Sequence, residues 1–155
     1  MRIDPLPLAK QICNEGAELA VKSRFENAIT CYETVITQLS TRRKIELLEV
    51  LAIAIYNKAL ALSSLNRHED AIAAYDLLIQ KFAKHPEPHL ALFVIKAMRN
   101  KAYRLNILQC YVDTIATYES LVKQFNEHKD PSIAEHVQTV KSFLAERQAA
   151  LDQLQ

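Results

Sequence analysis

The histidines are the side chains with the clearest potential for chemistry, and two of them, His85 and His89, stand four residues apart in the segment HPEPH. Two imidazoles at this spacing could approach a zinc ion, which favours nitrogen and sulfur ligands. No HExxH motif accompanies them. The segment FNEHKDP (125–131) repeats FAKHPEP (82–88) and places His128 at the position of His85. Because this position recurs, we expect turn or helix-capping histidines and no metal site.

The cysteines and the glycine content argue against most other chemistry. Cys13, Cys31 and Cys110 are scattered and form no CxxC pair, so a zinc ribbon or a thioredoxin-type motif is not indicated. Gly16 is the only glycine, whereas phosphate-binding loops, dinucleotide-binding loops and nucleophile elbows need several. We therefore expect no cofactor and no catalytic residues. A catalytic site assembled from distant residues is the enzymatic alternative that one sequence leaves open.

Length and charge narrow the class of protein further. The chain has 155 residues, a length that suits one domain with its own core. Its formal net charge is +1, whereas a dedicated nucleic-acid-binding protein needs a strongly basic face. The amino terminus lacks the apolar run of a signal peptide. The most apolar stretch, LLEVLAIAIYNKALAL, contains Glu49 and Lys58 and falls short of the roughly 20 apolar residues of a membrane span. We expect a cytoplasmic protein without a membrane partner.

Three copies of one pattern organise the chain. The copies are SRFENAITCYETVITQL, NRHEDAIAAYDLLIQKF and QCYVDTIATYESLVKQF. Tyr32, Tyr75 and Tyr118 are spaced by 43 residues, with no insertion between copies. The segments before the copies keep the same offset at Asn14, Asn57 and Asn100. Because the tyrosines occupy one repeated helical position, we expect them to pack in the core together with Phe82 and Phe125.

Apolar periodicity and proline placement predict an all-α chain of seven helices. Their expected ranges are 7–22, 25–39, 43–64, 68–83, 89–107, 111–126 and 132–152. The first six form three repeats, at about 7–39, 43–83 and 89–126, within a single domain spanning residues 1–155. The seventh starts a fourth unit and stops, so we expect it to cap the last apolar face. The junction LSTRRK (39–44) has neither proline nor glycine, and Ser40 or Thr41 is its expected helix cap.

The residues of the repeat resemble the tetratricopeptide repeat family. That family places a small residue in the first helix and Ala-x-x-x-aromatic in the second, and here Ala59 and Ala102 match the first element. AIAAY (71–75) and TIATY (114–118) match the second, although Thr114 is larger than alanine. A 43-residue period also lies in the HEAT and armadillo range of about 40–47, but the residues favour a bacterial tetratricopeptide variant with a lengthened first helix. The resemblance implies a right-handed α-solenoid that serves as a binding scaffold.

In such a solenoid the first helices line a concave groove, and helical rotation of about 100° per residue separates its face from the packing face. In the helix at 89–107 the packing face consists of Val94, Met98, Ala102 and Leu105. The predicted groove residues, carried across the repeats, are Lys10, Asn14, Ile53, Tyr56, Asn57, Leu60, Lys96, Arg99, Asn100 and Tyr103. Cys13 and Ala17 fall on the same face of the first helix, and Ile107 lies one turn beyond Tyr103. The repeated asparagines could bind the backbone of a peptide, or they could bond to the neighbouring helix and only fix the stack.

The leading interpretation is a non-enzymatic protein–protein interaction module that binds a peptide or helix of a partner. No acidic residue lies between Glu87 and Asp113, and the stripe Lys96, Arg99, Lys101 and Arg104 could receive an acidic or carboxyl-terminal ligand or could simply be solvated. In family members that clamp chaperone tails, Lys, Asn and Arg residues hold the tail. Asn57 and Lys96 match that clamp and Cys13, Ala17 and Asn100 do not, so we expect no binding to that class of tail. The alternative function is self-assembly as a homodimer through the groove or the end faces.

Overall fold

All seven predicted helices are present in the computed structural model, which describes residues 3–153 apart from the side chains of residues 150 and 151. The helices are α1 (Leu6–Val21), α2 (Phe25–Leu39), α3 (Ile45–Ser64), α4 (His68–Phe82), α5 (Pro88–Ile107), α6 (Tyr111–Phe125) and α7 (Pro131–Asp152). Each predicted boundary lies within two residues of the observed one, because prolines and the repeated turns mark the helix ends. Within the described part, no helix is both long and apolar enough to cross a membrane.

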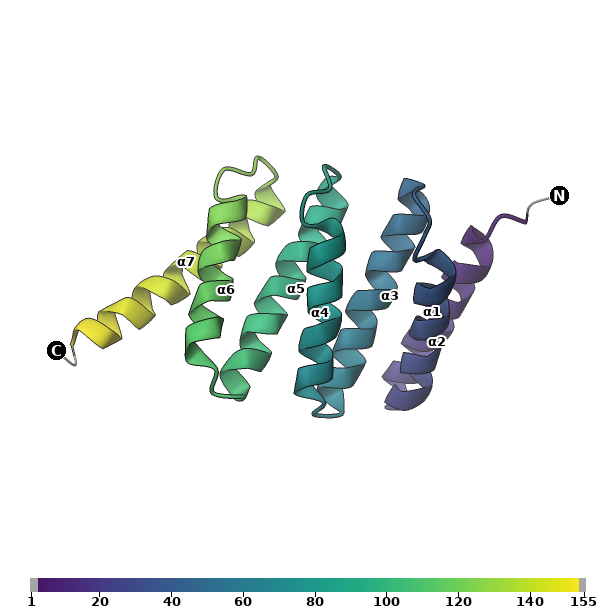
Figure 1. The fold of residues 1–155 in the computed structure, drawn as a ribbon, viewed down its shortest axis with the longest axis horizontal. Coiled ribbons are helices and arrows are strands. Elements are labelled where there is room, and N and C mark those ends of the chain that lie inside the picture. Colours follow the sequence, from purple (N-terminus) through teal and green to yellow (C-terminus); the bar gives the residue numbers. More distant parts are fainter. Residues whose placement is uncertain (1–2, 154–155) are drawn as a thin grey trace.

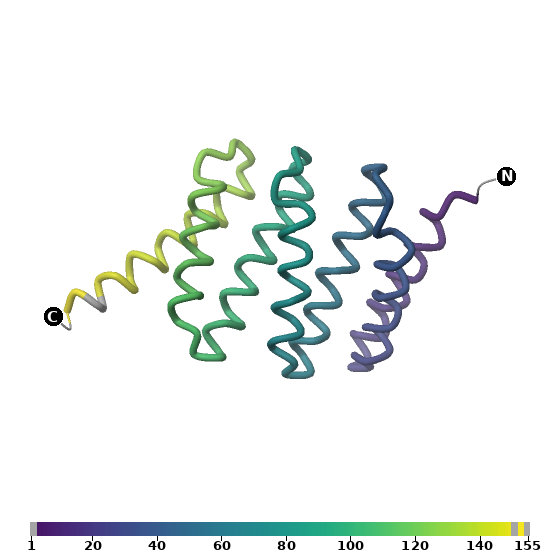
Figure 2. The backbone as a smooth tube through the Cα atoms, in the orientation of Figure 1, coloured from purple at the N-terminus to yellow at the C-terminus, as the bar shows by residue number. Residues whose placement is uncertain are grey.

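The helices stack in chain order, with the two termini at opposite ends of the stack (Figures 1 and 2). Each helix packs against the next, and α1, α3, α5 and α7 also contact one another in succession. The described residues of α2, α4 and α6 make no such contacts, so these helices form a second, more open row. This arrangement confirms the expected all-α solenoid, and α7 continues the first row as the predicted capping helix.

The core follows the repeat closely. Tyr32, Tyr75, Phe82 and Phe125 are buried as expected, and each contributes about 1.5–3 kcal/mol through burial. Tyr118 is half-buried because its ring lies at the edge of the stack, against Phe143 of α7 at a centroid distance of 4.9 Å. The predicted packing face of α5 is also buried: Val94, Met98, Ala102 and Leu105.

The turn inside each helix pair has the same unusual backbone. Ser23, Asn66 and Gln109 adopt left-handed conformations, with φ values of 58°, 57° and 61°. In each turn the next residue donates its N–H to a carbonyl five positions earlier, as Cys110 does to Leu105 at 2.9 Å. This is the hydrogen bond of a Schellman motif, which satisfies the last carbonyls of the first helix and reverses the chain.

The connectors between repeats confirm one expectation and correct another. The Nδ1 atoms of His85 and His128 accept the N–H of the residue two positions on, at 3.3 and 3.2 Å, so both histidines brace turns. The prediction that Ser40 or Thr41 caps the third helix was wrong. Ser40 ends α2 in a helical conformation, its hydroxyl donates to the Thr37 carbonyl within α2, and Lys44 occupies the position before α3. A serine committed to the preceding helix cannot adopt the extended backbone of an N-cap.

Candidate functional site

Five of the ten predicted groove residues converge on one cleft, which is formed by α3, α5, α6 and α7. The cleft has a volume of about 360 Å³ and is lined by Tyr56, Lys96, Arg99, Asn100, Tyr103, Tyr118 and His136. Tyr118 from α6 and His136 from α7 were not predicted to line it. The repeat assigned Tyr118 to the core, and the contact of His136 with Arg99 depends on how α7 packs against α5. The other five predicted residues, Lys10, Asn14, Ile53, Asn57 and Leu60, do not line this cleft.

The five predicted groove residues outside the cleft are all at least partly accessible to solvent. Lys10, Asn14 and Leu60 are exposed, and Ile53 and Asn57 are half-buried. Cys13, expected on the same face of α1, is buried. Its inward position follows from the packing of α1 against α2, which brings Gly16 and the ring of Tyr32 into close contact one turn further along.

One repeated asparagine fixes the helix stack. The Nδ2 atom of Asn100 on α5 donates a hydrogen bond to the Tyr56 hydroxyl on α3 at 2.8 Å. The pKa of Tyr56 is raised, because the effect of burial outweighs the Asn100 hydrogen bond and the charge of Arg99, which both lower it. The Tyr56 ring also lies against Tyr75 and Phe93, at centroid distances of 6.1 and 5.7 Å. In this repeat the asparagine therefore joins two neighbouring helices, and its amide oxygen and second N–H remain for further bonding.

The cationic part of the cleft is built around Arg99. Its Nη1 atom lies 2.6 Å from Nδ1 of His136 on α7, and since the guanidinium can only donate, His136 accepts in its neutral form. Burial lowers the pKa of His136, and the charges of Arg99 and Lys96 lower it further. The Lys96 ammonium lies 5.9 Å from the centre of the Phe93 ring. Among the described residues, no carboxylate lies within ion-pair distance of Lys96 or Arg99, so neither cation is neutralised by direct contact.

The structure divides the basic stripe of α5 between two sides of the helix. Lys101 points away from the cleft and pairs with Asp76 of α4 at 2.6 Å. The Arg104 guanidinium lies over the ring of Tyr103, 4.7 Å from its centre. Lys96 and Arg99 are consequently the residues of the stripe that line the cleft.

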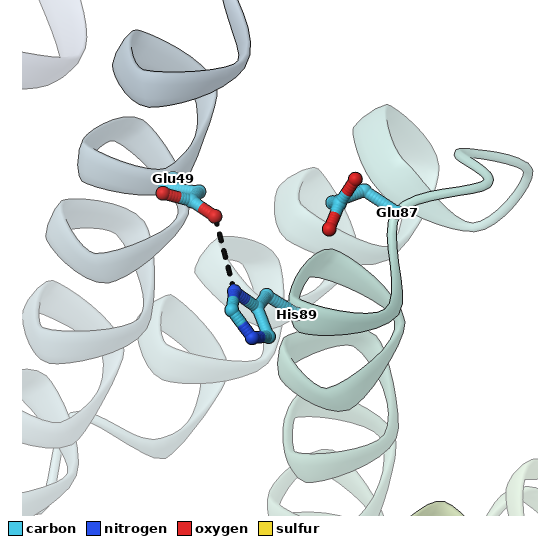
Figure 3. A group of neighbouring side chains, drawn as sticks. All are labelled: Glu49, Glu87 and His89. Carbon is cyan, nitrogen blue, oxygen red and sulfur yellow. Dashed lines mark hydrogen bonds and ion pairs between the residues drawn. The ribbon is translucent and has the colours of Figure 1, made fainter. Parts of the chain in front are cut away.

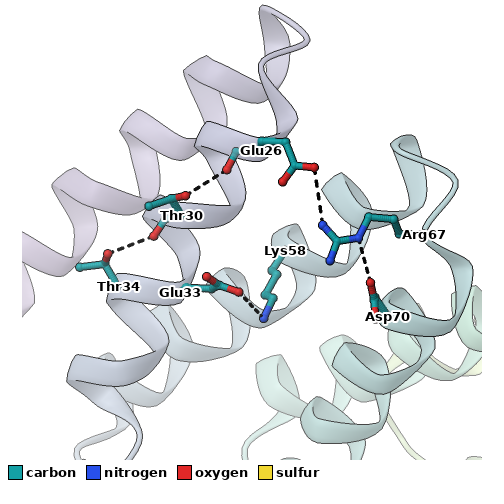
Figure 4. A network of polar contacts seen from close by, with 7 residues as sticks. All are labelled: Glu26, Thr30, Glu33, Thr34, Lys58, Arg67 and Asp70. Atoms are coloured by element: carbon teal, nitrogen blue, oxygen red, sulfur yellow. Dashed lines mark hydrogen bonds and ion pairs between the residues drawn. The ribbon is translucent and has the colours of Figure 1, made fainter.

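A larger cleft, which sequence reasoning missed, lies in the second row between α2 and α4 (Figure 4). It has a volume of about 750 Å³ and includes the apolar side chains Ile29, Ile36, Ile55, Leu62 and Leu77. Its cations are paired: Lys58 with Glu33 at 2.9 Å, and Arg67 with Asp70 at 2.8 Å and with Glu26 at 3.6 Å. The pairing neutralises both cations, in contrast to the cleft around Arg99.

This outer cleft follows the sequence repeat. A second cleft of about 440 Å³ lies between α4 and α6, and it contains the Lys101–Asp76 pair. Lys58 and Lys101 are separated by 43 residues, as are Glu33 and Asp76. The repeated lysine and acid were a visible signal, but their pairing depends on how α2 packs against α3 and how α4 packs against α5.

The thiols have the properties of packing residues. Burial, and then the neighbouring Cys31, raise the pKa of Cys13 to about 11. Burial and the charge of Glu15 also raise the pKa of Cys31. Because the thiolate is the nucleophilic form, these two cysteines are poorly suited to covalent chemistry at neutral pH.

Comparison with protein-family models and with curated proteins finds no match to this chain.

Proposed function

We propose that this chain is a non-enzymatic, tetratricopeptide-like binding module that takes a peptide or helix of another protein in its concave groove. The observation that carries this proposal is the cleft in which Lys96 and Arg99 lack a carboxylate partner among the described residues. An acidic side chain or a terminal carboxylate of the partner would supply the missing charge, and the Arg99 guanidinium has donors beyond the one directed at His136.

Exposed apolar side chains beside the cleft support the same proposal. Tyr103 at its edge is 53% exposed, and Leu60 and Ile107 are also exposed. Leu60 and Tyr103 occupy equivalent positions in successive repeats, so they would present an apolar strip along neighbouring first-row helices. Tyrosine and arginine are the residue types that most often dominate binding energy at protein interfaces.

A selection from an unbiased peptide library, followed by affinity measurement, tests the proposal. We expect selected peptides to be enriched in aspartate and glutamate, because the cleft is positive. The double variant Lys96→Glu with Arg99→Glu should weaken their binding at least tenfold, since each substitution replaces attraction by repulsion. Lys123→Glu, at an exposed position of α6 outside the cleft, is the matched control and should retain binding. Selected peptides that bind the double variant as tightly as the parent chain would contradict this site.

A second candidate, self-assembly, is favoured by the amino-terminal end of the stack. Leu8 on α1 is 52% exposed, whereas Leu51, at the equivalent position of the next repeat, is 1% exposed. Leu51 lies on α3, which packs against α1 of the first repeat. No repeat precedes α1 in the described stack, so Leu8 belongs to an end face that another copy of the chain could cover. Light scattering across a dilution series distinguishes the two candidates. A dimer that Leu8→Glu dissociates would support assembly, and a monomer at every concentration would exclude it.

A further inference from the structure

We infer a divalent metal site at Glu49, Glu87 and His89, where α3 meets the start of α5 (Figure 3). The site takes an ion such as Zn²⁺, which accepts nitrogen and oxygen ligands together. It is separate from the cleft around Arg99, and it does not depend on the proposed peptide binding.

The distances between the ligand atoms suit a single ion. One ligand atom from each side chain lies within 4.8 Å of the other two, and Nδ1 of His89 is 3.2 Å from Oε1 of Glu49. Zinc–nitrogen and zinc–oxygen bonds of about 2.0–2.2 Å place tetrahedral ligands about 3.4 Å apart. Side-chain rotation would bring the ligand atoms to this spacing, and one tetrahedral position remains for water.

The backbone that carries these ligands is well constrained. Glu87 stands between Pro86 and Pro88, whose rings fix φ, and Pro88 is the first residue of α5. Glu49 projects from α3, which packs against α5 along the first row. In Figure 3 the side chains of Glu49 and His89 point toward each other, and Glu87 lies above His89 on the segment entering α5. Little ordering of the chain is needed when the ion binds.

The local charge also favours a cation. Glu49 has His89 as its polar partner at 3.2 Å, and no lysine or arginine among the described residues lies within ion-pair distance of Glu49 or Glu87. Two neighbouring carboxylates with one imidazole leave net negative charge when the imidazole is neutral, which is the form that binds metal. The donor set mixes nitrogen with oxygen, and this favours zinc over magnesium, which prefers oxygen ligands alone.

The donor set occurs once and is not part of the repeat. One repeat further along, the equivalent residues are Leu92, Asp130 and Ser132. The junction between α5 and α7 therefore lacks both the histidine and one carboxylate. Because the neighbouring repeats stack without these side chains, packing of α3 against α5 does not account for their convergence.

Titration of the full chain with Zn²⁺, followed by calorimetry and thermal unfolding, tests the inference. We expect one ion to bind at this site and to raise the melting temperature, because it joins α3 to α5 in the folded state alone. His89→Ala and Glu87→Gln should each weaken the affinity at least tenfold and remove the shift in melting temperature. Glu46→Gln, at an exposed position in the first turn of α3, is the matched control and should bind as the parent does.

The outcomes separate this site from zinc bound elsewhere. All the altered side chains are accessible to solvent, so the variants should fold, and circular dichroism checks that they do. The inference is overturned if the parent chain binds no Zn²⁺. It is equally overturned if His89→Ala and Glu87→Gln bind the ion as tightly as the parent, because the ion then resides on other residues.

Discussion

The turn between α5 and α6 offers a direct test of the described backbone. Gln109 has a φ of 61°, its N–H donates to the Asn106 carbonyl at 3.0 Å, and Cys110 donates to Leu105 at 2.9 Å. The hydrogen bonds hold the chain in a conformation that residues with a Cβ atom disfavour. We therefore predict that Gln109→Gly stabilises the protein.

The size of the effect follows from two opposing terms. The left-handed conformation costs a residue with a side chain about 1–2 kcal/mol, whereas glycine loses about 0.5–1 kcal/mol through its greater freedom in the unfolded chain. The net gain is about 0.5–1 kcal/mol, which corresponds to about 1–4 °C in melting temperature for a chain of this size. Asn66→Gly, in the equivalent turn of the preceding repeat, should gain less because asparagine tolerates this conformation.

Guanidinium unfolding followed by circular dichroism measures the change in free energy. The matched control is Glu119→Gly, at an exposed position inside α6, which should lose about 1 kcal/mol because glycine weakens a helix interior. If Gln109→Gly destabilises the chain as much as Glu119→Gly does, the turn does not have the left-handed backbone described above.

Three further predictions concern packing and charge. Gly16→Val should cost about 2–3 kcal/mol of unfolding free energy, because a Cβ atom at Gly16 would lie 2.7 Å from Cε1 of Tyr32; denaturant titration measures the loss. The pKa of His136 is lowered in the folded state, so the unfolded chain binds its proton first and stability should decline as the pH falls below about 6.5. Melting temperatures measured from pH 7.5 to 5 should show a weaker decline in His136→Gln. Lys81→Met should cost about 1 kcal/mol in thermal or chemical unfolding, since it removes the 3.0 Å hydrogen bond from Lys81 to the Ser40 carbonyl.

Much of the fold was predictable because it is encoded locally and repeated. The apolar period defined the helices, and the 43-residue offset identified the buried tyrosines at positions 32 and 75. The errors arose where a residue's surroundings differ from those of its equivalents in the repeat. Ser40 has a residue type that suits a helix cap, but it ends α2 in a helical conformation. Cys13 was placed on the groove face by the 43-residue offset, yet its side chain is buried.

The candidate site was predictable only in part, since half of the predicted groove residues meet in one cleft. Tyr56, Arg99 and Asn100 were identified from the helical face, and these residues do line it. His136 was not identified, because its contact with Arg99 depends on where α7 docks against α5. The outer cleft between α2 and α4 was also missed, since the repeated lysine and acid do not define the distance between two helices that make no contact.

Periodicity in the sequence thus determines which residues form helices and which face of each helix is buried, because both properties depend on neighbours within a few turns. Tertiary packing decides which polar groups meet. The bond between Asn100 and Tyr56, the contact between Arg99 and His136, and the pair of His89 with Glu49 join residues that are 44, 37 and 40 positions apart. Such pairs are set by the distance and rotation between packed helices, and those quantities arise only when the repeats stack.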